Sequence, residues 1–204
     1  MVVGLGSGST AALLLAVLGA RVREGLRCTG VATSEATARL AGELGIPLAT
    51  LDERPSLDLD IDGADEVDPR HDLTKGQGGA LLREKIVASA ARRLVIMIDE
   101  SKLVRRLGEK VRIPVEVVAF GWRRTGEALR ALGAEPQLRG GEASPFITDG
   151  GNVVLDCRFG AQVDIAALAG GIKATTGVVE HGLFVGLHPM VLVGRRDGSC
   201  EVLE

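Results

Sequence analysis

Aromatic side chains are scarce in this sequence: Phe, Trp and Tyr together make up 2% of its 204 residues. An excess of basic charge is also missing, since the formal net charge is -3. Proteins that bind nucleic acid favour a basic surface and stacking side chains. A nucleic-acid partner is therefore not expected.

Cysteine and histidine are also few. Cys28, Cys157 and Cys200 lie far apart and form no CxxC pair, and the three histidines show no HxxxH spacing. An odd number of scattered cysteines is typical of reduced thiols in a cytosolic protein. A zinc site built from these residues is not expected.

A long hydrophobic run is the third absence. The nearest approach is ALLLAVLGA (Ala12–Ala20), which is too short to span a membrane and is preceded by no Lys or Arg. The sequence is otherwise 46% hydrophobic and 25% charged, as expected of a globular protein. It predicts a cytoplasmic protein without membrane contact.

The first half of the chain alternates strand and helix patterns, which predicts an α/β fold with a mainly parallel sheet and helices on both faces. The expected strands are Met1–Leu5, Cys28–Thr33 and Arg93–Asp99, and the expected helices are Ala11–Leu18, Glu35–Leu44 and Gly79–Ala91.

The second half has a different rhythm, β-α-β-β-α-β, which indicates a smaller α+β domain of the ferredoxin-like kind. A hairpin around Asp197 and Gly198 should return to the first domain. The expected elements are a helix at Ser101–Leu107, strands at Arg112–Phe120, Glu135–Arg139, Asn152–Arg158 and Val178–Phe184, and helices at Thr125–Leu132 and Asp164–Ile172.

A glycine-rich turn, GLGSGST (Gly4–Thr10), lies between the first strand and the first helix. Glycines let backbone amides approach a ligand, and a helix N-terminus favours an anion such as phosphate. The turn matches neither the dinucleotide fingerprint nor the P-loop. A tight turn with a Ser or Thr N-cap explains the pattern equally well.

An acidic stretch, DLDIDGADEVD (Asp58–Asp68), alternates carboxylates with apolar residues. It fails as a calcium loop because Pro69 stands where a bidentate Glu is needed, although spacing alone leaves a magnesium site open. We expect Asp58 and Asp60 to lie on a solvated edge strand. We expect Asp62 and Asp65 instead to lie in the turn after this strand, at the carboxyl edge of the sheet, where open α/β sheets bind ligands.

The stretch LTKGQGGALLREK (Leu73–Lys85) places a lysine and a glycine turn before a helix that carries Glu84. At about 100° per residue, Glu84 lies about 160° from Leu82 and Ile86 and so lies off the apolar stripe. Such a residue usually belongs to a solvated face, but a general base is placed in the same way. The stretch DESK (Asp99–Lys102) brings Lys102 to the same sheet edge, and an N-cap at Ser101 explains much of that pattern.

Taken in order, GLGSGST, TSEAT, DIDGADEVD, KGQGGALLREKIVA and IDESKLV resemble the motifs of the A-type ribose-5-phosphate isomerase family. The resemblance continues through IPVEVV and ITDGGNVVLD to the C-terminus. It implies a Rossmann-like domain, 1–107 plus 184–204, and a small lid domain, 108–183. It also implies interconversion of ribose 5-phosphate and ribulose 5-phosphate in the pentose phosphate pathway, without metal or other cofactor, in a homodimer or homotetramer.

The resemblance also implies residue roles. Glu84 matches the base, Asp62 and Asp65 match the aspartates for ring opening and sugar hydroxyls, and Lys75 matches the lysine beside the reacting carbons. The residues that match substrate-binding positions are Ser7, Gly8, Ser9, Thr10, Gly63, Ala64, Gly76, Gln77, Gly78 and Lys102.

Two features depart from the family pattern. Its members usually carry a helix before the first strand, which can supply a lysine to the substrate phosphate, whereas this sequence begins on the strand. We expect either a late start assignment or a protein that lacks this helix. Gln77 stands in a loop that the family fills with glycines, where we expect a modest effect.

Two other classes of protein share parts of this pattern. A non-catalytic sugar-phosphate sensor domain would use the phosphate loop but has no need of Glu84. A coenzyme A transferase would use a glutamate as nucleophile, with a larger acyl site. Binding without turnover would favour the sensor, and a covalent acyl-glutamyl adduct would favour the transferase.

Overall fold

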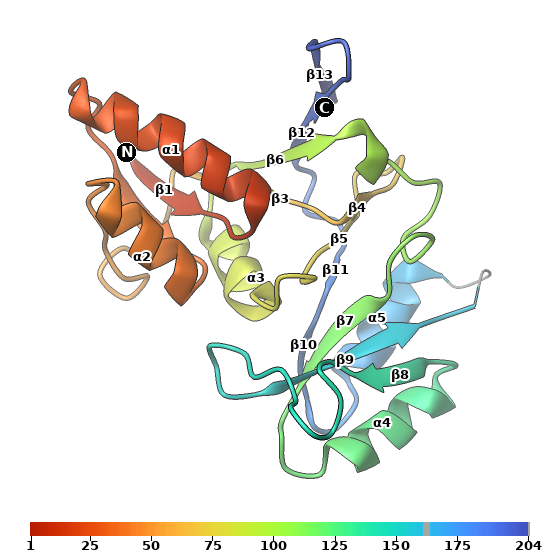
Figure 1. The fold of residues 1–204 in the computed structure, drawn as a ribbon. Helices are drawn as coiled ribbons and strands as arrows, with labels where there is room; N and C mark the ends of the chain where they lie inside the picture. The colour runs from red at the N-terminus through yellow and green to blue at the C-terminus, as the bar shows by residue number, and fades with distance from the viewer. Residues whose placement is uncertain (161–163, 204) are drawn as a thin grey trace. The chain divides into compact units, whose positions relative to one another are not determined.

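The structure is a computed structural model that describes residues 1–160 and 164–203. The chain forms two compact units and passes between them four times (Figure 1). The first unit comprises 1–64, 83–101 and 188–204, and the second comprises 65–82 and 102–187. The predicted domains differ from these units chiefly at segment 65–82, which lies in the second unit. The roles predicted for them, a catalytic domain and a lid, stay predictions. Residues 161–163 and 204, which those domains include, lie outside the described part.

The first unit contains a six-stranded sheet of order β13-β12-β6-β3-β1-β2. Neighbouring strands are parallel except β12 and β13, which form an antiparallel hairpin. The predicted mainly parallel sheet and the returning C-terminal hairpin are therefore confirmed. The strands are β1 (Val2–Leu5), β2 (Thr29–Ala32), β3 (Leu59–Gly63), β6 (Leu94–Asp99), β12 (Met190–Gly194) and β13 (Cys200–Leu203).

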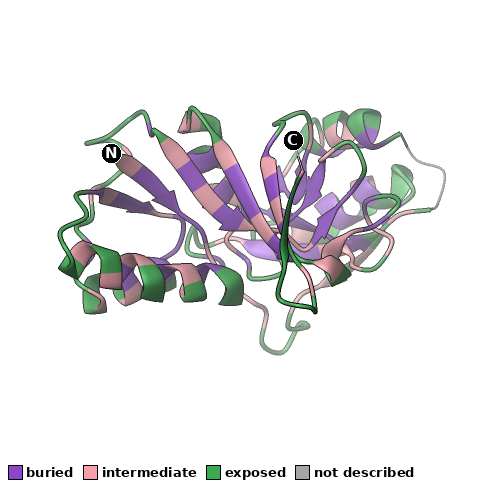
Figure 2. Ribbon diagram, turned by 90° about the horizontal axis from the view of Figure 1, so that it is seen from above, coloured by how far each residue is buried: buried purple, intermediate pink, exposed green. Residues whose placement is uncertain are grey.

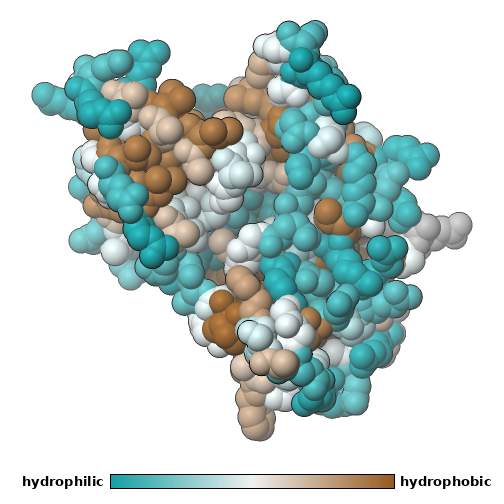
Figure 3. All heavy atoms as spheres, in the orientation of Figure 1, coloured by the Kyte–Doolittle hydropathy of each residue, from teal (hydrophilic) through white to brown (hydrophobic). Residues whose placement is uncertain are grey.

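Three helices accompany this sheet: α1 (Ser9–Arg23), α2 (Glu35–Glu43) and α3 (Leu81–Ala90). Helix α1 runs past the predicted end at Leu18 through Gly19, which is buried where a Cβ would come within 2.9 Å of Leu44 Cβ. Figure 2 shows buried residues following the strands. Leu13 and Val17 of α1 stay exposed, and Figure 3 shows hydrophobic side chains gathered over this helix.

The prediction that Asp60 lies on a solvated edge strand is wrong. Strand β3 lies between β1 and β6, and Asp60 is 1% exposed. Its side chain occupies space left by Gly4, where a Cβ would come within 2.4 Å of Asp60 Oδ1 and 2.6 Å of Val87 Cγ1. The carboxylate face of β3 is therefore the face that α3 covers. Asp58 is exposed, and its Oδ2 accepts a hydrogen bond from the Val2 N–H.

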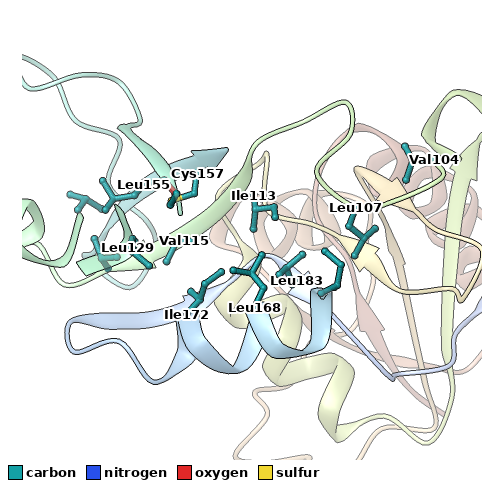
Figure 4. Packing of buried hydrophobic residues seen from close by; sticks show 14 residues of the cluster. Val104, Leu107, Ile113, Val115, Leu129, Leu155, Cys157, Leu168, Ile172 and Leu183 are labelled. Atoms are coloured by element: carbon teal, nitrogen blue, oxygen red, sulfur yellow. The ribbon is translucent and has the colours of Figure 1, made fainter. Parts of the chain in front are cut away.

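The second unit is built on a four-stranded antiparallel sheet of order β10-β7-β9-β8. In chain order these strands are the fourth, first, third and second, so the predicted β-α-β-β-α-β arrangement is confirmed. Figure 4 shows side chains of its core packed between this sheet and α5. The elements are β7 (Ile113–Val117), α4 (Trp122–Ala131), β8 (Glu135–Leu138), β9 (Val153–Arg158), α5 (Ile165–Lys173) and β10 (Val178–His181).

A three-stranded sheet of order β11-β5-β4 belongs to the same unit. Its strands are β4 (Glu66–Val67), β5 (Leu73–Thr74) and β11 (Leu183–Phe184). The predicted strand Val178–Phe184 is thus divided at Gly182, where a Cβ would come within 2.1 Å of the Lys75 carbonyl oxygen. At this close approach the chain leaves the four-stranded sheet after β10 and enters the three-stranded sheet as β11.

The predicted helix Ser101–Leu107 does not form. Only a 3₁₀ turn, η1 (Glu100–Lys102), is present, and Asp99 rather than Ser101 caps it by accepting from the Ser101 N–H (2.8 Å). The Val104 N–H then donates to the Val67 carbonyl (3.0 Å), which draws this segment toward β4. In the part of the chain that the structure describes, no helix is long and apolar enough to cross a membrane.

Candidate active site

The glycine turn of the first unit presents an open helix N-terminus. Gly8 is the N-cap of α1, at φ 92°, and no side chain caps the first helical amides. Ser9 and Thr10 are exposed beside them. Uncapped N–H groups and the helix dipole favour an anion at this position. Of the two interpretations of GLGSGST, the arrangement favours the anion site over a side-chain N-cap.

Ser7 has a different environment from Ser9 and Thr10. Its hydroxyl lies 2.8 Å from Thr33 Oγ1, 2.8 Å from Ser34 Oγ and 3.1 Å from Thr37 Oγ1. The Thr33 and Thr37 hydroxyls in turn donate to the carbonyls of Leu5 and Gly6, the two residues before Ser7. This buried hydroxyl cluster fixes the loop.

The motif TSEAT did not indicate a role for Thr33, Ser34 or Thr37. The available signal was three hydroxyl residues between the end of β2 and the first turn of α2. The sequence alone did not show that all three side chains would point at Ser7.

Asp62 joins the same loop from β3. Its Oδ1 accepts from the Ser7 N–H (3.1 Å) and from the Gly63 N–H (2.7 Å). Gly6 allows this contact, since a Cβ there would come within 2.1 Å of the same oxygen. An added Cβ at Gly63 would lie 3.7 Å from Thr10 Cβ. The ends of β1 and β3 and the start of α1 therefore meet at one edge of the sheet.

Glu84 lies on the buried face of α3. It is 5% exposed and lies in line with Leu81, Val87 and Ala88, whereas Ile86 is 45% exposed. The prediction that Glu84 lies off the apolar stripe is therefore wrong. Leu82 and Ile86 suggested the wrong face, because the small residue Ala88 completes the buried one.

The direction of α3 places Glu84 toward the carboxyl ends of the strands. The Leu57 N–H, just before β3, donates to the carbonyl of Ala90, the last residue of α3 (3.0 Å). Glu84 precedes Ala90 by six positions, about 9 Å at 1.5 Å per residue. It therefore lies nearer the end of β3 that carries Asp62 and Gly63, with Ala64 directly after it.

In the second unit, Lys75 follows β5 and opens the glycine loop. It is 4% exposed, its N–H donates to the Gly182 carbonyl (2.8 Å), and its Nζ lies 5.7 Å from the centre of the Phe184 ring. Gly76 has φ 102°, and its carbonyl accepts from the Gly79 N–H (3.0 Å). The backbone of this lysine is therefore held against β11, and the turn that follows it is closed.

Gln77 is exposed, as is Gly78. The Gln77 N–H donates to Asp65 Oδ2 (3.0 Å), and its side-chain Nε2 donates to the Arg112 carbonyl (2.9 Å). The residue that departs from the family pattern therefore ties the loop to Arg112, the residue before β7, through a hydrogen bond that glycine has no side chain to make.

Asp65 is a carboxylate close to the glycine loop and to three basic side chains. Burial raises the pKa of its carboxyl above the ordinary value of 3.8. The Gln77 N–H and the charges of Lys75, Lys102 and Arg139 act in the opposite direction but do not cancel the effect of burial. Lys102, the last residue of η1, is half-buried.

Replacing Asp65 with asparagine should increase stability in a pH-dependent way. An acid whose pKa is raised by folding stabilises the fold below its unfolded pKa, and that contribution is lost as pH rises through the folded pKa. The free energy of unfolding of Asp65→Asn, relative to that of the parent chain, should therefore increase with pH from about pH 3.8. It should level off once the pH exceeds the folded pKa of Asp65. Urea titrations across this range would measure it. A difference that falls with pH would contradict the direction of the shift.

The candidate residues thus fall into two sets. The first unit holds Ser7, Gly8, Ser9, Thr10, Asp62, Gly63, Ala64 and Glu84, and the second holds Asp65, Lys75, Gly76, Gln77, Gly78 and Lys102. Three of the four passages of the chain between units lie within two residues of a candidate, after Ala64, Leu82 and Ser101.

A cavity of about 610 Å³ in the first unit contains none of these residues. It is lined mainly by apolar side chains from β2, segment 48–53 and α3. Among the described residues, no group of three or more His, Cys, Asp or Glu is arranged to hold a metal ion.

Comparison with known sequences relates the chain to one group of enzymes. The family model of ribose 5-phosphate isomerase A (phosphoriboisomerase A) matches residues 29–198. The ribose-5-phosphate isomerase A of Roseiflexus sp. (strain RS-1) is 54% identical over 205 residues, which cover 99% of this chain and 88% of that protein. The enzyme of the same name from Gloeobacter violaceus is 54% identical over 204 residues, with coverage of 100% and 88%.

Solved structures agree with the sequence comparison. A D-ribose-5-phosphate isomerase in complex with phospho-erythronic acid is 39% identical, with a TM-score of 0.95, and the match covers 100% of this chain and 90% of that one. The ribose 5-phosphate isomerase A of Methanocaldococcus jannaschii is 44% identical, with a TM-score of 0.94 and coverage of 100% and 91%.

Proposed function

Because the chain belongs to the ribose 5-phosphate isomerase A family, we propose that it interconverts D-ribose 5-phosphate and D-ribulose 5-phosphate through an enediolate. The observation that carries the proposal is the buried carboxylate of Glu84, placed by α3 toward the carboxyl ends of the parallel strands. A sensor domain that only binds a sugar phosphate has no use for such a group.

Glu84 is proposed as the general base. Its carboxylate takes the proton from C2 of the open-chain aldose, which leaves an enediolate with negative charge on the C1 oxygen. It then returns the proton to C1, while the hydroxyl proton of the C2 oxygen moves to the C1 oxygen. A positioned carboxylate of this kind typically contributes 10²- to 10⁴-fold to the rate.

Lys75 is proposed to stabilise the enediolate oxygens, together with the glycine loop. A buried ammonium on an anchored backbone is already in place when charge develops, which is how preorganised donors lower a barrier. Asp65, whose carboxyl has a raised pKa because of burial, is proposed to work with Asp62 in ring opening and in holding the sugar hydroxyls. Gly63, Ala64 and Lys102 complete the proposed sugar contacts.

The loop Ser7–Thr10 is proposed to hold the phosphate. The exposed hydroxyls of Ser9 and Thr10 and the uncapped amides of α1 support this role. Ser7 contributes by orienting the loop through its hydroxyl cluster. The predicted lid function of 108–183, the homodimer or homotetramer, the cytoplasmic location and the place in the pentose phosphate pathway remain proposals of the same kind.

The function is tested by following ribulose 5-phosphate formation from ribose 5-phosphate in the presence of excess chelator. We expect turnover at the same rate with and without chelator, because a base, a lysine and backbone donors supply the chemistry without a metal. Turnover that chelation abolishes and a divalent cation restores would contradict the metal-free mechanism. Binding of ribose 5-phosphate without any turnover would favour the sensor domain.

A further inference from the structure

Arg139, directly after β8, reaches the glycine loop of the same unit. Its Nη1 donates to the carbonyls of Gly76 and Gln77, each at 3.0 Å. Its Nε and Nη2 donate to the two oxygens of Asp156 on β9, at 3.0 and 2.5 Å. One guanidinium therefore links a strand of the four-stranded sheet to two consecutive peptides of the loop.

The arginine is itself held in place. Its N–H donates to the Val154 carbonyl (2.9 Å), and its carbonyl accepts from the Phe146 N–H (2.9 Å). The Arg139 and Asp156 side chains are 15% and 20% exposed, and the guanidinium lies 5.6 Å from the centre of the Phe146 ring. A bidentate, partly buried pair of this kind has a well-defined geometry.

These contacts decide how the loop peptides face. In a trans peptide the N–H points opposite to the carbonyl. With both carbonyls directed at Arg139, the Gln77 N–H points away from it and donates to Asp65 Oδ2 (3.0 Å). By the same rule, the Gly78 N–H also points away from Arg139. One side chain thus contacts both peptides, and the first of them is also held by the Gly79 N–H and by Asp65.

The far end of the loop, at Gly79, lies against Phe146, whose ring is beside the Arg139 guanidinium. Gly79 has φ 82°, and a Cβ there would come within 2.3 Å of Phe146 Cζ. Lys75 begins the loop one residue before the Gly76 carbonyl that Arg139 holds. The loop is therefore restrained from Lys75 to Gly79 on the side of Arg139 and Phe146.

We propose that Arg139, braced by Asp156, is a positioning residue for the isomerase reaction: it sets the peptide orientations of the loop and thereby the placement of Lys75 and of the Gly78 amide. The proposal rests on the proposed function, in which Lys75 and this loop stabilise the enediolate. Arg139 is not assigned any contact with substrate.

Lysine is an informative replacement for Arg139 because it keeps the positive charge but lacks the planar guanidinium group with its several N–H donors. An ammonium group on a flexible stem does not satisfy Asp156 and two carbonyls at once. We expect Arg139→Lys to lower kcat by about 10- to 100-fold, the size of effect that small misplacements of catalytic groups produce. KM for ribose 5-phosphate should change by less than about threefold, because the lost interaction acts mainly in the transition state.

The matched control is Arg112→Lys. The Arg112 guanidinium also donates to a backbone carbonyl of the second unit, that of Glu135 (2.9 Å), and the Arg112 carbonyl that receives Gln77 is unchanged by the substitution. This variant should retain the parent kcat. A second variant, Arg139→Ala, leaves a space beside Asp156, and added guanidinium ion should restore part of its activity, a rescue that general destabilisation would not show.

Amide hydrogen exchange of residues 76–79 provides a readout that does not depend on turnover. Exchange should be faster in Arg139→Lys than in Arg112→Lys, because the loop has lost its brace. Equal exchange in the two variants, or a folded Arg139→Lys protein with the parent kcat, would overturn the proposal. If the parent chain shows no turnover, the proposed function fails, while the exchange comparison still decides whether Arg139 fixes the loop.

Discussion

Glu84→Gln is expected to lower kcat for ribose 5-phosphate isomerisation by about 10²- to 10⁴-fold, the range typical of a lost general base. Glutamine has nearly the shape of glutamate, but its neutral amide does not accept a proton from carbon. KM should change much less than kcat, since the shape of the site is retained. The decisive measurement pairs steady-state kinetics with NMR detection of proton exchange at C2 in deuterium oxide. Both the exchange and the overall conversion should be lost together.

The stability of the variant separates a chemical effect from a structural one. Glu84 is 5% exposed, and glutamine fills nearly the same volume at this buried position. The thermal midpoint of Glu84→Gln should therefore stay close to that of the parent. Glu43→Gln, which changes an exposed glutamate at the end of α2 in the same unit, serves as control and should leave kcat unchanged. A folded Glu84→Gln protein whose kcat stays within a few-fold of the parent would eliminate Glu84 as the base.

Glu66→Ala should produce the largest loss of stability. Glu66 is fully buried, and its carboxylate accepts four hydrogen bonds, from the Thr74 hydroxyl (2.9 Å) and from the amides of Gly108 (2.6 Å), Lys110 (2.6 Å) and Val111 (3.1 Å). Alanine leaves three backbone donors without this acceptor. Because unsatisfied buried groups and lost charged hydrogen bonds are costly, we expect the free energy of unfolding to fall by about 3 to 5 kcal/mol.

The measurement can be made specific for the second unit. The chain has a single tryptophan, and Trp122 lies in α4 of that unit, so its fluorescence during urea unfolding reports on the unit that contains Glu66. Glu66→Gln should lie between the parent and Glu66→Ala, since its oxygen still accepts from two amides while its NH₂ group faces another donor. Glu135→Gln, an exposed carboxylate of the same unit, should change the free energy of unfolding by less than about 0.5 kcal/mol. Equal stability of Glu66→Ala and the parent would contradict the structural role of this carboxylate.

The sheet architecture could be predicted because it follows from local patterns. Alternation of strands and helices indicated the parallel sheet, and the β-α-β-β-α-β rhythm indicated the second unit. Both depend on hydrophobic periodicity, which is visible in any window of the chain. The hairpin at Asp197 and Gly198 was predictable for a similar reason, since turn residues between two apolar runs are a local signal.

Features that depend on distant segments could not be predicted in this way. The helix expected at Ser101–Leu107 fails because Val104 donates to Val67, a partner that local propensity does not include. Asp60 was expected in solvent, but Gly4 of another strand leaves room for its carboxylate beneath α3. Glu84 was placed on the wrong face because the burial of Ala88 rather than Ile86 is set by what α3 covers.

The candidate residues show the same limit. Their identities came from motifs, but their supports did not. The hydroxyls of Thr33, Ser34 and Thr37 and the guanidinium of Arg139 lie far along the chain from the loops that they hold. A motif marks residues that act on a ligand more clearly than it marks residues that orient them.

The four passages of the chain between its units also bear on how such a gene can change. The first unit is encoded in three separate stretches and the second in two. Neither unit can therefore be exchanged between genes by one recombination event at a single junction. An exchange of one complete unit would need crossovers at all four junctions.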